Sequence, residues 1–230
     1  MRRRHLMTAS LSMCLPAAWA RAQASAAPIV LELFTSQGCS SCPPADALLG
    51  ELARRPGVIG LAWHVDYWNR LGWRDPFAMP AWTGRQRDYA RSLGEEVYTP
   101  ALVVNGAAMV VGSDRAQVER TIAAAAPPIV PVSLRRGSAG IEADVGPMGA
   151  RVNGLLAIYD PEQTTQVGAG ENHGRRLVEY RVVRRAIPVE VASGRLALPP
   201  VPDGSGAVLL IRDAAGKILG AGDSPPMKQS

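Results

Sequence analysis

Residues 29–53 read IVLELFTSQGCSSCPPADALLGELA, and this stretch predicts a strand, a turn and a helix in succession. The segment 29–34 is apolar and contains β-branched residues, which is typical of a buried strand. The prolines at 43–44 fit the first turn of a helix, because the amides of that turn have no partner inside the helix. Cys39 and Cys42 are therefore predicted to lie at the N-terminus of a helix that follows a strand.

The rest of the chain divides into two halves. Up to residue 126 strands alternate with helices, which indicates an α/β fold, and a helix connects the strands at 29–34 and 57–65, so we expect these strands to be parallel. Beyond residue 131 short apolar runs between Gly and Pro turns predict a small antiparallel β module. The other expected elements are a helix at 78–93, strands at 101–106 and 109–112, a helix from 113–114 to 126, and short strands at 132–134, 140–145, 155–159, 176–183, 195–198 and 207–211.

The first 24 residues have the features of a secretory signal peptide. Residues 2–5 are basic, residues 6–18 are modestly apolar, and two small-x-small sites end at Ala20 and Ala24. We expect cleavage after one of these two alanines, and a periplasmic or secreted protein. The paired arginines also fit a twin-arginine signal, so the export route, general secretory or twin-arginine, stays open.

Composition places the chain among ordinary globular proteins, since 47% of its 230 residues are apolar and 20% are charged. The formal charge of +5 falls to +1 without the leader, because four of the 25 basic residues (Arg2, Arg3, Arg4 and Arg21) are removed, leaving 21 against 20 acidic ones. We therefore expect no nucleic-acid partner. No run of about 18 apolar residues follows the leader, so we expect no stable membrane span. The oligomeric state is left open.

Two cysteines remain in the mature chain, because Cys14 lies in the leader. In an oxidising compartment Cys39 and Cys42 form a disulfide or a reactive dithiol, and two thiolates cannot make a four-thiolate zinc site. A helix N-terminus favours the thiolate of Cys39, and Cys42 would then resolve a mixed disulfide formed on Cys39. The alternative is an inert structural disulfide.

The Thr99-Pro100 step strengthens the redox interpretation. Together with the C-x-x-C motif it resembles the thioredoxin-like superfamily over residues 29–126. The resemblance implies that Pro100 is cis and faces the dithiol, that Thr99 offers its backbone to an extended peptide substrate, and that no metal ion reaches the sulfurs. It also implies the fold class, an α/β thioredoxin-like fold (25–127) followed by a small antiparallel β-rich C-terminal module (128–230).

Longer motifs give a closer resemblance, which covers nearly the whole mature chain. They are LELFTSQGCSSCPPAD (31–46), HVDYWNRLGWRDPF (64–77), VYTP (97–100) and GENHGRRLVEY (170–180). The chain is similar to the family called domain of unknown function 1223, secreted bacterial proteins with a thioredoxin-like region. This resemblance implies no particular reaction. The last motif suggests no chemistry to us beyond a surface ion pair between Glu171 and Arg175.

One departure from the thioredoxins concerns the acid on the first strand, which in those proteins assists deprotonation of the second cysteine. Here the only acid on that strand is Glu32, one residue further from the first cysteine. A shift of one residue can turn a side chain to the opposite face of a sheet. Glu32 is therefore either the proton acceptor or a glutamate bonded to solvent or backbone.

His64 and Asp66 follow the second predicted strand, and the carboxyl ends of parallel strands meet at one edge of a sheet. His64 could therefore act as an acid or base or stabilise the Cys39 thiolate, with Asp66 orienting it. A copper site made by Cys39, Cys42 and His64 is the metal alternative. Satisfaction of nearby backbone groups by His64 and Asp66 is the alternative without chemistry.

The sequence thus favours an exported thiol–disulfide oxidoreductase that acts on protein or small-molecule thiols or disulfides. Its catalytic residues would be Cys39, Cys42 and Pro100, supported by Thr99, Glu32, His64 and Asp66, without a cofactor or resident metal. Two alternatives use the same cysteines: a copper-binding or chaperone protein, and a non-catalytic binding module with a structural disulfide. The direction of the redox reaction and the partner stay open.

Overall fold

The computed structural model describes residues 27–137, 140–149 and 152–227. The predicted signal peptide lies outside the described residues. The helices are α1 (Pro43–Leu52), α2 (Pro80–Leu93) and α3 (Arg115–Ala124), with a 3-10 turn, η1 (Asn69–Leu71). The strands are β1 (Ile29–Thr35), β2 (Val58–His64), β3 (Ala101–Val104), β4 (Ala108–Val111), β5 (Val132–Gly137), β6 (Gly140–Val145), β7 (Asn153–Gln166), β8 (Arg176–Val189), β9 (Gly194–Ala197), β10 (Gly206–Arg212) and β11 (Ile218–Ser224).

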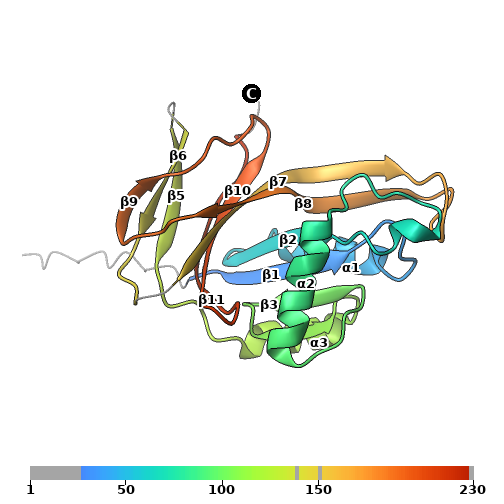
Figure 1. The fold of residues 1–230 in the computed structure, drawn as a ribbon, viewed down its shortest axis with the longest axis horizontal. Coiled ribbons are helices and arrows are strands. Elements are labelled where there is room, and N and C mark those ends of the chain that lie inside the picture. The colour runs from blue at the N-terminus through green and yellow to red at the C-terminus, as the bar shows by residue number, and fades with distance from the viewer. Residues whose placement is uncertain (1–26, 138–139, 150–151, 228–230) are drawn as a thin grey trace, which may run out of the picture.

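One large mixed sheet forms the centre of the molecule (Figure 1). Its eight strands follow the order β11-β10-β7-β8-β2-β1-β3-β4, and a separate sheet has the order β5-β6-β9. Within the described residues no helix is long and apolar enough to cross a membrane.

The predicted strand–helix–strand unit is present. β1 and β2 pair in parallel on either side of the α1 crossover, with Thr35 opposite His64. Alternation along β1 sends Leu31 and Leu33 into the apolar core beneath α1, whereas Phe34 packs with α2 on the other face of the sheet. The two faces of β1 therefore belong to two different cores.

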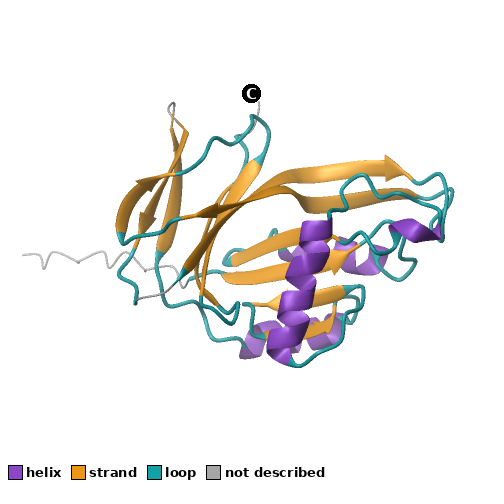
Figure 2. Ribbon diagram, viewed as in Figure 1, coloured by secondary structure: helices purple, strands orange, loops and turns teal. Residues whose placement is uncertain are grey.

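The predicted fold class, a thioredoxin-like fold over 25–127 followed by a small antiparallel β-rich module, is wrong. Strands account for 41% of the structure and helices for 19%, and Figure 2 shows the helices confined to one part of it. Four of the C-terminal strands, β7, β8, β10 and β11, extend the same sheet that contains β1–β4. Within the described residues β5, β6 and β9 form a separate sheet, whereas β8 pairs in parallel with β2 at Ala62 and Val182 and so joins the C-terminal half to the large sheet.

The strands of the β7–β8 hairpin are longer than the apolar runs that predict them. Each strand has 14 residues. The first half of β7 is apolar and buried on both faces, whereas its second half, Pro161–Gln166, is polar and mostly exposed. Because apolar runs predict strands, the sequence predicts a strand only over 155–159 and a loop over the polar half. Through this polar half the hairpin extends past α1 and reaches the cysteine loop.

The close packing of α1 on β8 gives a test of this architecture. A Cβ atom built on Gly50 of α1 would overlap the ring of Tyr180 on β8, whereas one built on Gly84 of α2 would meet nothing within 4 Å. We expect Gly50→Ala to lower the free energy of unfolding by about 1–3 kcal/mol through overpacking. Gly84→Ala, the matched control in a helix interior, should raise it by about 0.5–1 kcal/mol. Urea unfolding of both variants measures the difference, and equal effects would contradict the α1–β8 contact.

Candidate functional site

A disulfide joins Cys39 and Cys42 at the N-terminus of α1, as the sequence predicts. The two Cα atoms are 5.4 Å apart, and Cys42 is the N-cap residue of the helix. Both cysteines are fully buried, at 0% exposure, although Ser40 and Ser41 between them are exposed. The loop therefore reaches the surface while the sulfurs lie beneath it.

The immediate surroundings of Cys39 differ from a helix end with free amides. The prolines at 43–44 have no N–H, and the next two amides both donate to the carbonyl of Cys42. The Ser41 Oγ lies 3.3 Å from Cys39 Sγ, and it must be the donor because a disulfide sulfur carries no hydrogen. Stabilisation of a Cys39 thiolate therefore falls to this hydroxyl and to the helix dipole.

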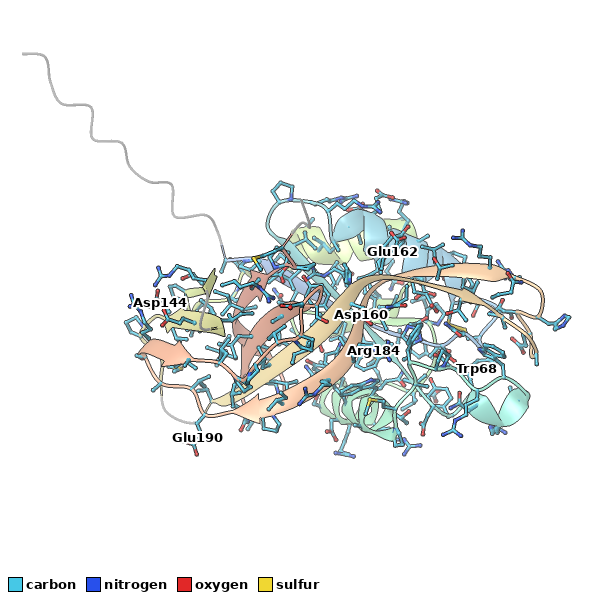
Figure 3. The ribbon with its side chains drawn as sticks, turned by 90° about the horizontal axis from the view of Figure 1, so that it is seen from above. Trp68, Asp144, Asp160, Glu162, Arg184 and Glu190 are labelled. Carbon is cyan, nitrogen blue, oxygen red and sulfur yellow. A yellow bond between two sulfur atoms is a disulfide. The ribbon has the colours of Figure 1, made fainter. Side chains whose placement is uncertain are left out.

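The Thr99–Pro100 peptide bond is cis, and Pro100 is buried. Trp68 Nε1 donates to Thr99 Oγ1 at 2.8 Å. A Cβ atom built on Gly112 would contact both Ala45 of α1 and Pro100, at 3.3 and 3.5 Å, so the cis peptide lies close to the first turn of α1. Figure 3 shows Trp68 at the opposite end of the molecule from Asp144 of the three-stranded sheet.

Glu32, the acid expected to serve the cysteines, points to the other face of the sheet. Arg85 of α2 donates to both of its carboxylate oxygens, at 2.7 and 2.9 Å, and the Tyr89 hydroxyl donates to one of them. Glu32 is fully buried in this arrangement. The structure therefore does not bring Glu32 to the disulfide.

His64 is fully buried on the face of the sheet that packs against α1, and its partner is not Asp66. His64 Nδ1 donates to Asp75 Oδ2 at 2.8 Å, whereas Asp66 accepts a hydrogen bond from Thr83 Oγ1 at 2.6 Å. Burial alone would lower the pKa of His64, but the carboxylates of Asp75, Glu179 and Asp46 outweigh it and raise the pKa to about 9. Burial would raise the pKa of Asp75, but the histidine cation holds it below its usual range.

Two further acids complete what we call the buried acid cluster (Asp46, His64, Asp75 and Glu179). Asp46 lies one helical turn beyond Cys42 on the same face of α1, and burial raises its pKa to about 7. Burial also raises the pKa of Glu179, whose Oε2 accepts a hydrogen bond from Gln37 Nε2 at 2.8 Å. Glu179 Oε1 and His64 Nε2 are 4.0 Å apart. The cluster thus holds one cation, His64, together with a carboxyl, Asp46, that exchanges its proton near neutral pH.

Three polar atoms of the buried acid cluster make no hydrogen bond within the described part of the chain: Asp46 Oδ1, His64 Nε2 and Glu179 Oε1. Buried polar atoms are nearly always paired, so three unpaired atoms in one cluster need an explanation, and a role in proton exchange is a chemical one. Within the same residues no three His, Cys, Asp or Glu side chains are arranged to hold a metal ion.

The turn of the β7–β8 hairpin covers the cysteine loop. Asn172 is fully buried, and its Nδ2 donates to the carbonyls of Gln37 and Cys39, both at 2.9 Å. The amide of Ser40 donates to Glu171 Oε2 at 3.1 Å. The ion pair expected between Glu171 and Arg175 is not formed, since Arg175 Nη1 donates to Asn172 Oδ1 instead.

Four residues of this site were missed in the sequence: Asp46, Asp75, Asn172 and Glu179. Asp46 could have been found, because four residues after Cys42 is the same face of a helix. Asp75 lies within a quoted motif, but nothing in its spacing favours it over Asp66 as the partner of His64. Asn172 and Glu179 lie within the motif at 170–180, but no spacing or residue pattern there indicates a contact with the cysteines.

The His64–Asp75 pair predicts how stability depends on pH. Because the pKa of folded His64 is raised from 6.5 to about 9, its contribution is fully present below pH 6.5 and is lost as pH rises through 9. We expect the free energy of unfolding of the wild-type protein to fall by on the order of 3 kcal/mol over this window. Asp75→Asn should remove most of that dependence, and Asp88→Asn, an exposed acid on α2, should not. Urea unfolding at pH 6.5 and 9.5 measures the change in the free energy of unfolding. An equal decrease in all three proteins would contradict the stabilising role of the His64–Asp75 pair.

Comparison with known proteins places the chain in a group without an assigned activity. No curated protein matches it. The crystal structure of protein AGR_C_4864 from Agrobacterium tumefaciens is 32% identical, with a TM-score of 0.76, over 89% of this chain and 97% of that one. HBP35 of Porphyromonas gingivalis is 15% identical, with a TM-score of 0.54 over 89% and 78% of the two chains, which is a likeness of fold alone. A family model described as protein of unknown function (DUF1223) matches residues 30–205. This chain therefore belongs to the DUF1223 family.

Proposed function

We propose that this protein is an exported thiol–disulfide oxidoreductase whose redox centre is the Cys39–Cys42 disulfide. The observation that carries the proposal is a carboxyl, Asp46, buried one turn beyond Cys42 with its pKa raised to about 7. A group that gains and loses a proton at neutral pH beside a sulfur leaving group suits acid–base catalysis of thiol exchange. The proposal that the protein is exported rests on the predicted signal peptide in residues 1–24.

The exchange reaction can be written with these residues. A substrate thiolate attacks Cys39 Sγ, the disulfide bond breaks, and its electron pair leaves on Cys42 Sγ, which takes the proton held by Asp46. A second substrate thiolate then attacks the substrate sulfur of the mixed disulfide, and Cys39 leaves as a thiolate. Two substrate thiolates become one disulfide and the protein gains two electrons. Asp46 and the Cys39 thiolate then take up two protons from solvent, which balance the two that the substrate thiols released on ionising. The reverse sequence oxidises the protein and reduces a substrate disulfide.

One observation favours a different function, a binding module with a structural disulfide. Both cysteines are at 0% exposure, and inert disulfides are commonly buried, whereas reactive cysteines are partly exposed. The two functions differ in whether the two cysteines play different roles. In exchange one sulfur forms the mixed disulfide and the other releases it, whereas in a structural disulfide the two are equivalent.

Single cysteine variants therefore test the proposal. We expect reduced Cys42→Ser to accumulate mixed disulfides on Cys39 when mixed with an extract of exported proteins, because no second thiol releases the product. Cys39→Ser should accumulate few, because in the proposed mechanism Cys42 is the resolving thiol and does not attack the substrate. Non-reducing gels and intact mass measure the adducts. Equal yields from both variants, or none from either, would support the structural disulfide.

Asp46→Asn tests the proton transfer by its pH profile. When the reduced wild-type protein is oxidised by glutathione disulfide, we expect the rate to rise as pH increases through about 7, because the Asp46 carboxylate accepts the proton of Cys42. In Asp46→Asn this inflection should disappear and the rate at pH 7.5 should fall about 100-fold. Asp88→Asn serves as the control and should keep the wild-type profile. A profile unchanged by Asp46→Asn would remove Asp46 from the mechanism.

A further inference from the structure

The complete burial of the disulfide raises the question of how a substrate reaches it. Attack on a disulfide needs a thiolate to approach the sulfur along the S–S axis, and access is one of the factors that determine its rate. Cys39 is at 0% exposure even though its neighbour Ser40 is exposed. A segment that covers Cys39 must therefore move before exchange.

We infer that the hairpin tip (residues 167–175, between β7 and β8) controls access to the disulfide, with Asn172 and Glu171 as the residues that hold it closed. This inference rests on the proposed function and names the residues that determine which thiols reach its centre. The two side chains make three hydrogen bonds to the backbone of Gln37, Cys39 and Ser40. Since these bonds involve the carbonyl of Cys39 itself, they fix the segment that carries the attacked sulfur.

The hairpin tip is tied within itself and so can separate from the cysteine loop as a unit. The amide of Val167 donates to the carbonyl of Arg175, and the amide of Gly174 donates back to the carbonyl of Val167. Arg175 Nη1 orients Asn172 by donating to its Oδ1 at 2.8 Å. Loss of the bonds to the cysteine loop would therefore leave the tip folded.

The other contacts of the hairpin tip are with the segment around η1. Gly170 approaches the carbonyl of Leu71, and both Gly168 and Gly170 lie against the side chain of Trp73. Figure 1 shows the β7–β8 pair running beside β2 and ending near this segment. These contacts are to the backbone of Leu71 and to Trp73, and no ion pair among the described residues joins the tip to this segment. The bonds of Asn172 and Glu171 are therefore the specific attachment of the tip to the cysteine loop.

The inference is tested by the rate at which dithiothreitol reduces the native disulfide. In this reaction dithiothreitol closes to its cyclic disulfide while the protein gains two electrons and two protons, so no physiological substrate is needed. We expect Asn172→Ala to be reduced about tenfold faster than the wild-type protein and Glu171→Ala several-fold faster, because each loses bonds that keep the tip closed. His173→Ala is the matched control, since His173 is exposed and its side chain makes no hydrogen bond within the described residues.

Global stability must be measured in the same proteins by urea unfolding of the oxidised form. Faster reduction of Asn172→Ala and Glu171→Ala at unchanged stability supports the inference. Rates equal to wild type in both, or a rise matched by an equal loss of global stability or by His173→Ala, overturn it. The proposed function fails separately, when the Cys42→Ser and Cys39→Ser variants form equal adducts, so the two failures are distinguishable.

Discussion

The pairing of β8 with β2 is the contact on which the site depends. It is a short parallel contact, and Arg181 beside it adopts the left-handed conformation with φ of 55°. A non-glycine residue in this conformation carries strain. The Arg181 guanidinium donates to the carbonyl of Gly60 on β2, to the hydroxyl of Tyr159 and to Asp223. One arginine thus ties β8 to strands on both sides of it, and this attachment brings Glu179 to Gln37 and His64 and the hairpin tip to the cysteine loop.

The electrostatics of the site follow from the two faces of β1. On the α2 face Glu32 and Arg85 neutralise each other in a closed pair. On the α1 face the His64 cation is shared among three carboxyls, and burial raises the pKa of Asp46, whose Oδ1 makes no hydrogen bond among the described residues. The Asp46 carboxyl, whose pKa burial raises to about 7, stays protonated up to neutral pH. A buried acid therefore forms a closed ion pair on the α2 face and a proton-exchanging carboxyl on the α1 face.

The sequence was sufficient for the parts of the site that are local in the chain. The C-x-x-C helix, its disulfide and the parallel β1–β2 unit follow from residues 29–65, where apolar periodicity and prolines determine the structure. The family resemblance predicts a buried acid on the first strand, whereas the acid near the cysteines, Asp46, lies on α1 four residues after Cys42. Asn172 lies 133 residues from Cys39 and Gln37 lies 142 residues from Glu179. These contacts depend on the register between two 14-residue strands, which shifts between Ile158 and Tyr159, and no local pattern specifies such a register.

The same separation along the chain has a consequence for the order of events during biogenesis. Contacts between residues far apart in sequence are the slow ones to form, because the intervening chain must be closed into a loop first. The cysteine loop needs only residues near 29–65 and is complete long before the chain that carries Asn172 has been made. A newly made molecule therefore passes through a stage in which the cysteine loop has formed and the hairpin tip does not yet cover it. The cover arrives afterwards, so the disulfide is introduced into an uncovered loop and is enclosed by the last strands to fold.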